Sequence, residues 1–136
     1  MQSVFELKTE LPFDADAFEG MQKVARDLLR DAEAGPFTQA IVLLSAQGAK
    51  YGALIPNALS EEKTEERALM ECVNSRNDTE IRRVLCRWQD GGIDLPSADF
   101  RRMLCALNVQ NTESGIFVMT RQGVSVISLD ATLNRK

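Results

Sequence analysis

The chain has 136 residues, 44% hydrophobic and 26% charged, a composition typical of one soluble globular domain. Its net charge of −4 gives no positive field to hold a nucleic-acid backbone, and no run of about 18 apolar residues is long enough to span a membrane. Histidine is absent, which excludes Ser-His-Asp and Cys-His catalysis and every metal site that needs an imidazole.

The sequence predicts neither a secreted protein nor a disulfide framework. The first six residues lack the basic and apolar regions of a signal peptide. Cys72, Cys86 and Cys105 make an odd number without close pairing, which favours a reducing compartment. We therefore expect a single cytoplasmic domain over residues 1–136, with no nucleic-acid and no membrane partner.

The first half of the chain predicts a helix followed by a hairpin. Apolar residues recur at three- and four-residue steps over 14–33, as in an amphipathic helix. Residues 40–44 are a short apolar run with β-branched residues at its centre, typical of a strand covered on both faces. Residues 50–55 follow a glycine-containing turn and are expected to return as its hairpin partner. Residues 3–8 alternate weakly and could form a short strand or an extended arm.

The second half predicts two more helices and three more strands. Ser60 is a candidate cap for a helix over 61–75, whose inner side would carry Ala68, Leu69, Cys72 and Val73. The remaining segments are a strand over 81–88, a helix over 97–107, a hairpin from 116–119 and 124–127, and a short terminal turn over 129–133. This order of elements predicts an α/β sheet with helices on its faces and at least one parallel crossover.

Two of the predicted helices begin with distinctive sequences, about thirty residues apart. Residues 64–67 read Thr-Glu-Glu-Arg, and residues 96–104 read Pro-Ser-Ala-Asp-Phe-Arg-Arg-Met-Leu. They resemble the two motifs of the cytidine deaminase-like superfamily, short nucleoside deaminase type. In that family His or Cys, one residue and Glu begin the first helix, and Pro-Cys-x-x-Cys followed by Arg begins the second. The resemblance covers about residues 14–133.

The resemblance implies a three-layer α-β-α sandwich with a mixed five-stranded sheet and helices on both faces. It also implies self-association, as a dimer or tetramer, and a nucleoside-like ligand. The metal-binding positions, however, carry Thr64, Ser97 and Phe100. A neutral hydroxyl or a phenyl ring is a poor substitute for the thiolate or imidazole that zinc requires. The Asn-x-Glu that holds the ribose in this family is also missing near Asn57. We therefore expect no metal and no cofactor.

The candidate site residues also have plain structural explanations. In the resemblance, Glu66 takes the place of the proton-shuttling glutamate, yet acids in the first turn of a helix are favoured by its dipole whatever the function. Ser97 after Pro96 is a good helix cap, and Phe100 begins an apolar stripe. We expect a ligand pocket lined by Thr64, Ser97 and Phe100, in which Glu66, Thr64 and Ser97 offer hydrogen bonds to a small polar ligand.

Three functional hypotheses remain open at this point. The first is a zinc-free, deaminase-inactive protein that binds a small ligand or acts in assembly. The second is a metal-independent enzyme on the same scaffold, because one fold hosts unrelated chemistries. The third is a deaminase with unorthodox zinc ligands, for which Cys72, Cys86 and Cys105 would have to form a displaced metal site. Core packing is favoured over that site, since cysteine is among the most buried residue types.

Overall fold

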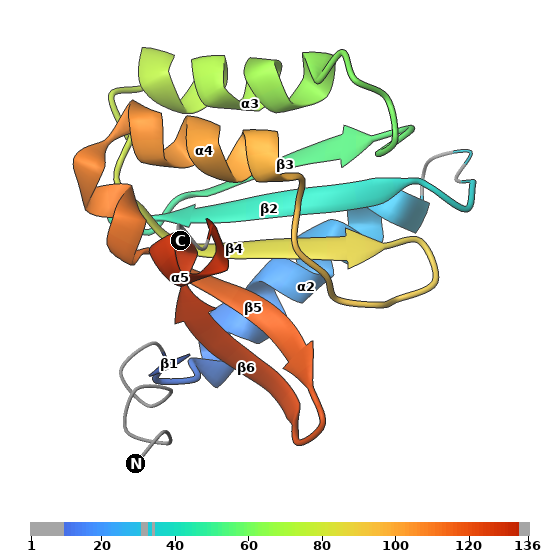
Figure 1. Cartoon of the computed structure of the whole chain (residues 1–136). Coiled ribbons are helices and arrows are strands. Elements are labelled where there is room, and N and C mark those ends of the chain that lie inside the picture. The colour runs from blue at the N-terminus through green and yellow to red at the C-terminus, as the bar shows by residue number, and fades with distance from the viewer. Residues whose placement is uncertain (1–9, 31–32, 34, 134–136) are drawn as a thin grey trace.

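Five helical segments are present in the computed structural model, which describes residues 10–30, 33 and 35–133 (Figure 1). They are α2 (Ala15–Arg30), α3 (Thr64–Ser75), α4 (Ala98–Leu107), the 3-10 helix η1 (Val109–Glu113) and α5 (Leu129–Leu133). The helices predicted from periodicity are therefore confirmed. The weakly alternating stretch at 3–8 lies outside the described residues.

The described strands form one mixed sheet. They are β1 (Glu10–Leu11), β2 (Gln39–Ser45), β3 (Lys50–Ile55), β4 (Ile81–Trp88), β5 (Gly115–Thr120) and β6 (Gly123–Ser128). Their order is β1-β6-β5-β4-β2-β3, and every neighbouring pair is antiparallel except β4 and β5, which are parallel. The five predicted strands are confirmed, and the two-residue β1 adds a sixth at one edge.

The helices cover both faces of this sheet, as the prediction required. Figure 1 shows α3 and α4 side by side over one face and α2 running across the other. Strand β2 therefore contributes to two cores, with Ile41 and Leu43 packed under α3 and α4, and Ala40 and Val42 packed under α2. All four side chains are essentially inaccessible to solvent. Alternate residues of a strand point to opposite faces, so a strand covered on both sides is apolar throughout.

The start of α3 differs from the prediction in two ways. The helix begins at Thr64, and Ser60 does not cap it: the Ser60 hydroxyl accepts a 3.2 Å hydrogen bond from the backbone N–H of Glu62 in the preceding bend. Lys63 separates this bend from the helix, because its backbone is left-handed, with φ 52°. The predicted inner face is also partly wrong. Ala68 is exposed, whereas Glu66 is buried with Leu69 and Val73.

The start of α4 agrees with the prediction. Ser97 is the N-cap, and Phe100 and Leu104 are the buried residues of the helix. No helix among the described residues is long and apolar enough to cross a membrane.

Candidate functional site

The two helix starts singled out in the sequence lie at the same end of one layer. Helices α3 and α4 are in contact, and both begin on the side of the molecule where strand β4 ends (Figure 1). The backbone N–H groups of a first helical turn have no partner within the helix, and the helix dipole adds partial positive charge there. The starts of α3 and α4 are therefore suited to bind a polar or negatively charged group, although the layer between these helices and the sheet is otherwise apolar.

Glu66 is the unusual residue of this region. It lies in the first turn of α3 with only 3% of its surface exposed, and its Oε1 atom has no hydrogen-bond partner. Burying a carboxylate without full hydrogen bonding opposes folding, and such groups are rare in folded proteins. The sequence singles out Glu66 through the resemblance, as a vestigial catalytic candidate, but does not predict its burial. The spacing from Glu66 to Leu69 and Val73, at three and seven residues, could have indicated it.

The environment of Glu66 includes Cys86 of strand β4. Burial raises the pKa of the Cys86 thiol well above its ordinary value, and the negative charges of Asp94 and Glu66 raise it further. The thiol is therefore held protonated. A thiolate is the form of cysteine that binds metals and attacks electrophiles, so Cys86 contributes neither function in this state.

Ser97 and Phe100 are brought together by the cap of α4. The Ser97 hydroxyl accepts a 3.1 Å hydrogen bond from the backbone N–H of Phe100. The Phe100 ring is fully buried and belongs to the core cluster beneath α3 and α4. In contrast, Thr64 is exposed and lines a small hollow of about 140 Å³ with Asn57 and Ser60. The three predicted pocket residues thus do not surround one open cavity in this structure, because Phe100 faces the core.

The residues at this site do not fit zinc. Ser97 uses its hydroxyl oxygen as a cap, and Phe100 has no donor atom. Among the residues that the structure describes, no group of three His, Cys, Asp or Glu side chains could hold a metal ion. Cys72 on α3 and Cys105 on α4 are half-buried, and neither belongs to such a group.

A strained residue, Lys63, lies between Glu62 and Thr64, which line the small hollow at the start of α3. Lys63 adopts the left-handed conformation that residues other than glycine and asparagine rarely take, and no side chain caps the helix. The Lys63 ammonium donates a 2.8 Å hydrogen bond to the carbonyl oxygen of Ser60, which stabilises this turn. Strain of this kind at a helix start is typical of segments that bind or release ligands.

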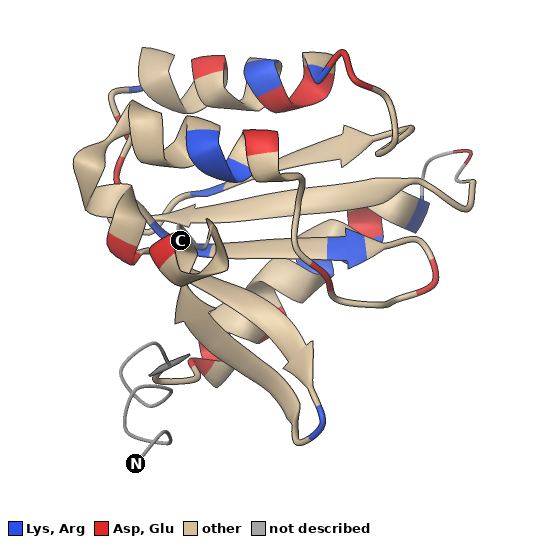
Figure 2. Cartoon of the chain, in the orientation of Figure 1, with Lys and Arg blue, Asp and Glu red and all other residues tan. Residues whose placement is uncertain are grey.

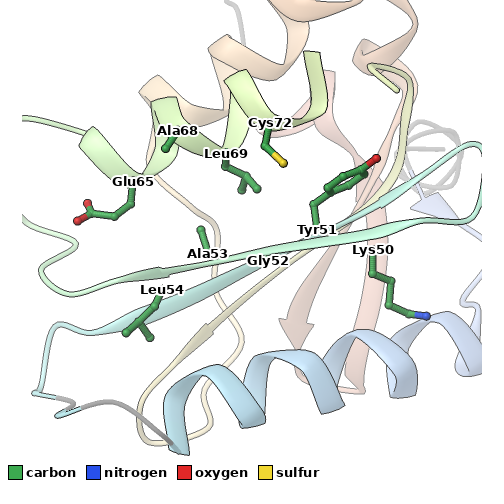
Figure 3. A pocket seen from close by; sticks show the side chains of 9 residues that line it. All are labelled: Lys50, Tyr51, Gly52, Ala53, Leu54, Glu65, Ala68, Leu69 and Cys72. Atoms are coloured by element: carbon green, nitrogen blue, oxygen red, sulfur yellow. The ribbon is translucent and has the colours of Figure 1, made fainter. Parts of the chain in front are cut away.

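A larger hollow runs along the outer edge of strand β3, and sequence reasoning did not predict it. It measures about 440 Å³, and it is lined by Lys50, Tyr51, Gly52, Ala53, Leu54, Glu65, Ala68, Leu69 and Cys72. Figure 3 shows Tyr51 and Ala53 on the side of β3 that faces α3, with Lys50 directed toward α2. The Tyr51 hydroxyl donates a 2.7 Å hydrogen bond to Asp78, which fixes the ring at one end of the hollow.

Structure comparison finds the same architecture in solved enzymes. The cytidine deaminase of Mycobacterium leprae superposes with a TM-score of 0.64 at 17% identity, over 87% of this chain and 98% of that one. The chain has the cytidine deaminase fold. The cytidine deaminase of Mycobacterium tuberculosis superposes with a TM-score of 0.61 at 13% identity, over 85% of this chain and 93% of that one. The cytidine deaminase of Burkholderia pseudomallei gives 0.60 at 14% identity, over 83% and 93%.

The similarity to cytidine deaminases is found by comparing structures, and comparison of sequences does not detect it. No protein-family model matches the chain, and no curated protein matches it either. At identities of 13–17%, the cytidine deaminase fold establishes the arrangement of helices and sheet and leaves the chemistry to be argued from the side chains.

Proposed function

We propose that this chain is a zinc-free member of the cytidine deaminase fold that binds a small nucleoside-like ligand without deaminating it. The observation that carries the proposal is the Glu66 carboxylate, which is buried at the start of α3 with its Oε1 atom unpartnered. A carboxylate oxygen accepts hydrogen bonds from N–H and O–H groups, and the amino and hydroxyl groups of a nucleoside supply both. A ligand of this class would satisfy an acceptor that the protein leaves open.

The side chains around Glu66 favour binding over hydrolysis. In zinc deaminases the metal lowers the pKa of a bound water to roughly 7, and a glutamate moves the protons. Here a capping hydroxyl and a buried phenyl ring stand at two of the metal positions given by the resemblance, Ser97 and Phe100. Glu66 therefore has no activated water to serve, and its role is that of an acceptor.

Access to Glu66 requires movement of the turn before α3. The hollow lined by Asn57, Ser60 and Thr64 lies directly at this turn, and Lys63 is strained there. A ligand that enters this hollow meets Ser60 and Thr64 first, and opening of the turn, in which Lys63 Nζ leaves the carbonyl oxygen of Ser60, extends the hollow toward Glu66. The cost of opening would be offset by the strain released at Lys63.

Calorimetry and thermal unfolding of the metal-free protein with cytidine, deoxycytidine and uridine test this proposal. At a ligand concentration about 100-fold above Kd, bound protein should gain about 2.7 kcal/mol of stability. Glu66→Gln should weaken binding, whereas Glu65→Gln, which alters the neighbouring and more exposed acid, should not. Assays for released ammonia should remain negative. About one zinc per chain in protein purified without added metal would overturn the proposal, and so would ammonia release.

A groove between α3 and α4 favours self-association as a second function. It measures about 360 Å³, and its apolar lining is Met70, Met103, Ala106 and Leu107, with Arg67 and Glu71 at its rim. In a two-fold symmetric dimer, both copies use the same groove. Arg67 of each copy can then pair with Glu71 of the other. Light scattering should show a dimer or tetramer, and Met103→Asp should shift it toward monomer. A monomeric wild-type protein at all concentrations would contradict this function.

The enzyme hypotheses require evidence of turnover. A metal-independent enzyme would need a poised acid or base, for which Glu66 is the candidate. Screening nucleosides for product formation, with Glu66→Gln as the control, separates such an enzyme from a binding protein. A deaminase with unorthodox zinc ligands would need donors that the described residues do not bring together.

A further inference from the structure

Three arginines converge on the face of the sheet opposite the candidate site. Arg26 and Arg30 of α2 and Arg87 of β4, together with Leu29 and Gln89, line a hollow of about 310 Å³. Figure 2 shows blue stretches on the later turns of α2 and at the end of β4, on the same side of the molecule. We propose that this hollow is a binding site for the phosphate group of a small molecule.

Arg87 provides the inner wall of the hollow. Its side chain leaves strand β4 and reaches α2, where Nη1 donates a 2.9 Å hydrogen bond to Oε1 of Gln22. This contact fixes the guanidinium, yet its Nε atom is buried and has no hydrogen-bond partner. A planar donor that is already held in place is suited to an incoming oxyanion, because part of the ordering cost is already met.

Positive charge is concentrated around this group. Arg26 and Arg30 are four residues apart and lie on the same face of α2, where like charges repel. Burial lowers the pKa of Arg87, and the charge of Arg26 lowers it further, which shows that the two cations act on each other. An anion placed between them would relieve the repulsion.

Two nearby carboxylates, Asp27 and Asp90, act on this cluster. Asp27 lies 3.1 Å from Nη2 of Arg30 and 3.7 Å from Nζ of Lys23, so one acid is shared by two cations. Asp90 acts on Arg87 from the other side and opposes the effect of Arg26. Among the residues that the structure describes, the ion pairs of this cluster thus belong to Asp27, and Arg26 is in neither of them.

The chemistry of the lining favours phosphate over other anions. Guanidinium groups bind phosphate oxygens through two parallel N–H donors, and a phosphate monoester carries about −1.5 to −2 charges near pH 7. A volume of about 310 Å³ is at the lower end of the range for small-molecule pockets, so it holds a phosphate and a short organic part. The net charge of −4 makes a polynucleotide a poor candidate for this site.

Isothermal titration calorimetry with inorganic phosphate and with ribose 5-phosphate tests the site. Arg26→Gln and Arg87→Gln should each raise Kd by about tenfold, as expected for one lost hydrogen bond to a charged group. Arg121→Gln is the matched control, since it makes the same charge change at the exposed turn between β5 and β6 and should leave Kd unchanged. Tighter binding of ribose 5-phosphate would identify a phosphorylated metabolite as the ligand class, and equal binding would identify phosphate itself.

Two results would overturn the proposal: no binding of either probe at millimolar concentration, or equal weakening by all three substitutions, which would indicate nonspecific screening. Arg26 is exposed on a helix, so its variant should fold even if the Arg87 variant does not, and urea unfolding checks both. The hollow and Glu66 lie on opposite faces of the sheet, so nucleoside binding should be unchanged by both substitutions. The phosphate site and the nucleoside site can therefore be refuted independently.

Discussion

The Ser97 hydroxyl accepts a 3.1 Å hydrogen bond from the backbone N–H of Phe100, whose ring is fully buried beneath the same helix. One residue caps α4, and the other anchors it to the sheet. Both stand where the resemblance to zinc deaminases places metal ligands. A helix start that could bind a cation through thiolates is thus stabilised here by capping and apolar packing.

Removing the cap should destabilise the protein modestly. Ser97→Ala leaves an N–H of the first turn of α4 without its acceptor, so we expect a loss of about 1 kcal/mol in the free energy of unfolding. Ser97→Asp retains an acceptor and should cost much less. Urea unfolding measures both variants, and equal losses would show that Ser97 stabilises the fold by another contact.

Removing the anchor should cost considerably more. Phe100→Ala deletes a fully buried ring and leaves a cavity, for which we expect a loss of about 3–5 kcal/mol. Phe13→Ala is a suitable control, because Phe13 is 47% exposed and should cost far less. A loss below about 1 kcal/mol for Phe100→Ala would instead indicate a ring that lines a ligand cavity, since no packed core would be lost.

The buried acid should oppose stability. Glu66→Gln replaces a buried carboxylate that has an unpartnered oxygen with a neutral amide, so we expect unfolding to become harder by about 1 kcal/mol at neutral pH. Glu65→Gln should change stability little, because that side chain is more accessible to solvent. Increased stability together with weaker nucleoside binding would mark Glu66 as a functional residue. Decreased stability would mean that its carboxylate is well paired.

The three cysteines should differ in reactivity. The Cys86 thiol is fully buried and its pKa is raised by burial and by nearby carboxylates, so in the native protein it should resist thiol reagents even at mildly alkaline pH. Cys72 and Cys105 are half-buried and should react first. Mass spectrometry after a short exposure to iodoacetamide would show this order, and labelling of Cys86 at the same rate as the others would contradict it.

The bond between Tyr51 and Asp78 should produce a pH dependence at alkaline pH. The hydrogen bond to Asp78 raises the pKa of Tyr51 above its ordinary value near 10, because it favours the neutral phenol. Its stabilisation is therefore present below pH 10 and is lost as the pH rises through the native pKa. Tyr51 is the chain's sole tyrosine, so its phenolate absorbance reports this titration directly. Asp78→Asn should lower the measured pKa, and an unchanged value would exclude the bond in solution.

Local patterns in the sequence predicted most of the elements and the α/β class. The three- and four-residue apolar steps predicted α2 and α4, and the short apolar run at 40–44 predicted a strand covered on both faces. These predictions hold because periodicity reports which side of an element is buried. The two-residue β1 was missed because its pairing with β6 joins residues far apart in the chain, which no local pattern records.

The sequence by itself indicated the cytidine deaminase fold, through its resemblance at two helix starts, and the absence of imidazole chemistry. Only the tertiary structure decided which side chains meet. It buried Glu66, placed Phe100 in the core, and brought Arg87 of β4 to two arginines of α2 that are some sixty residues earlier. Burial and charge clustering arise from packing between distant segments, whereas a sequence pattern fixes only the geometry within each segment.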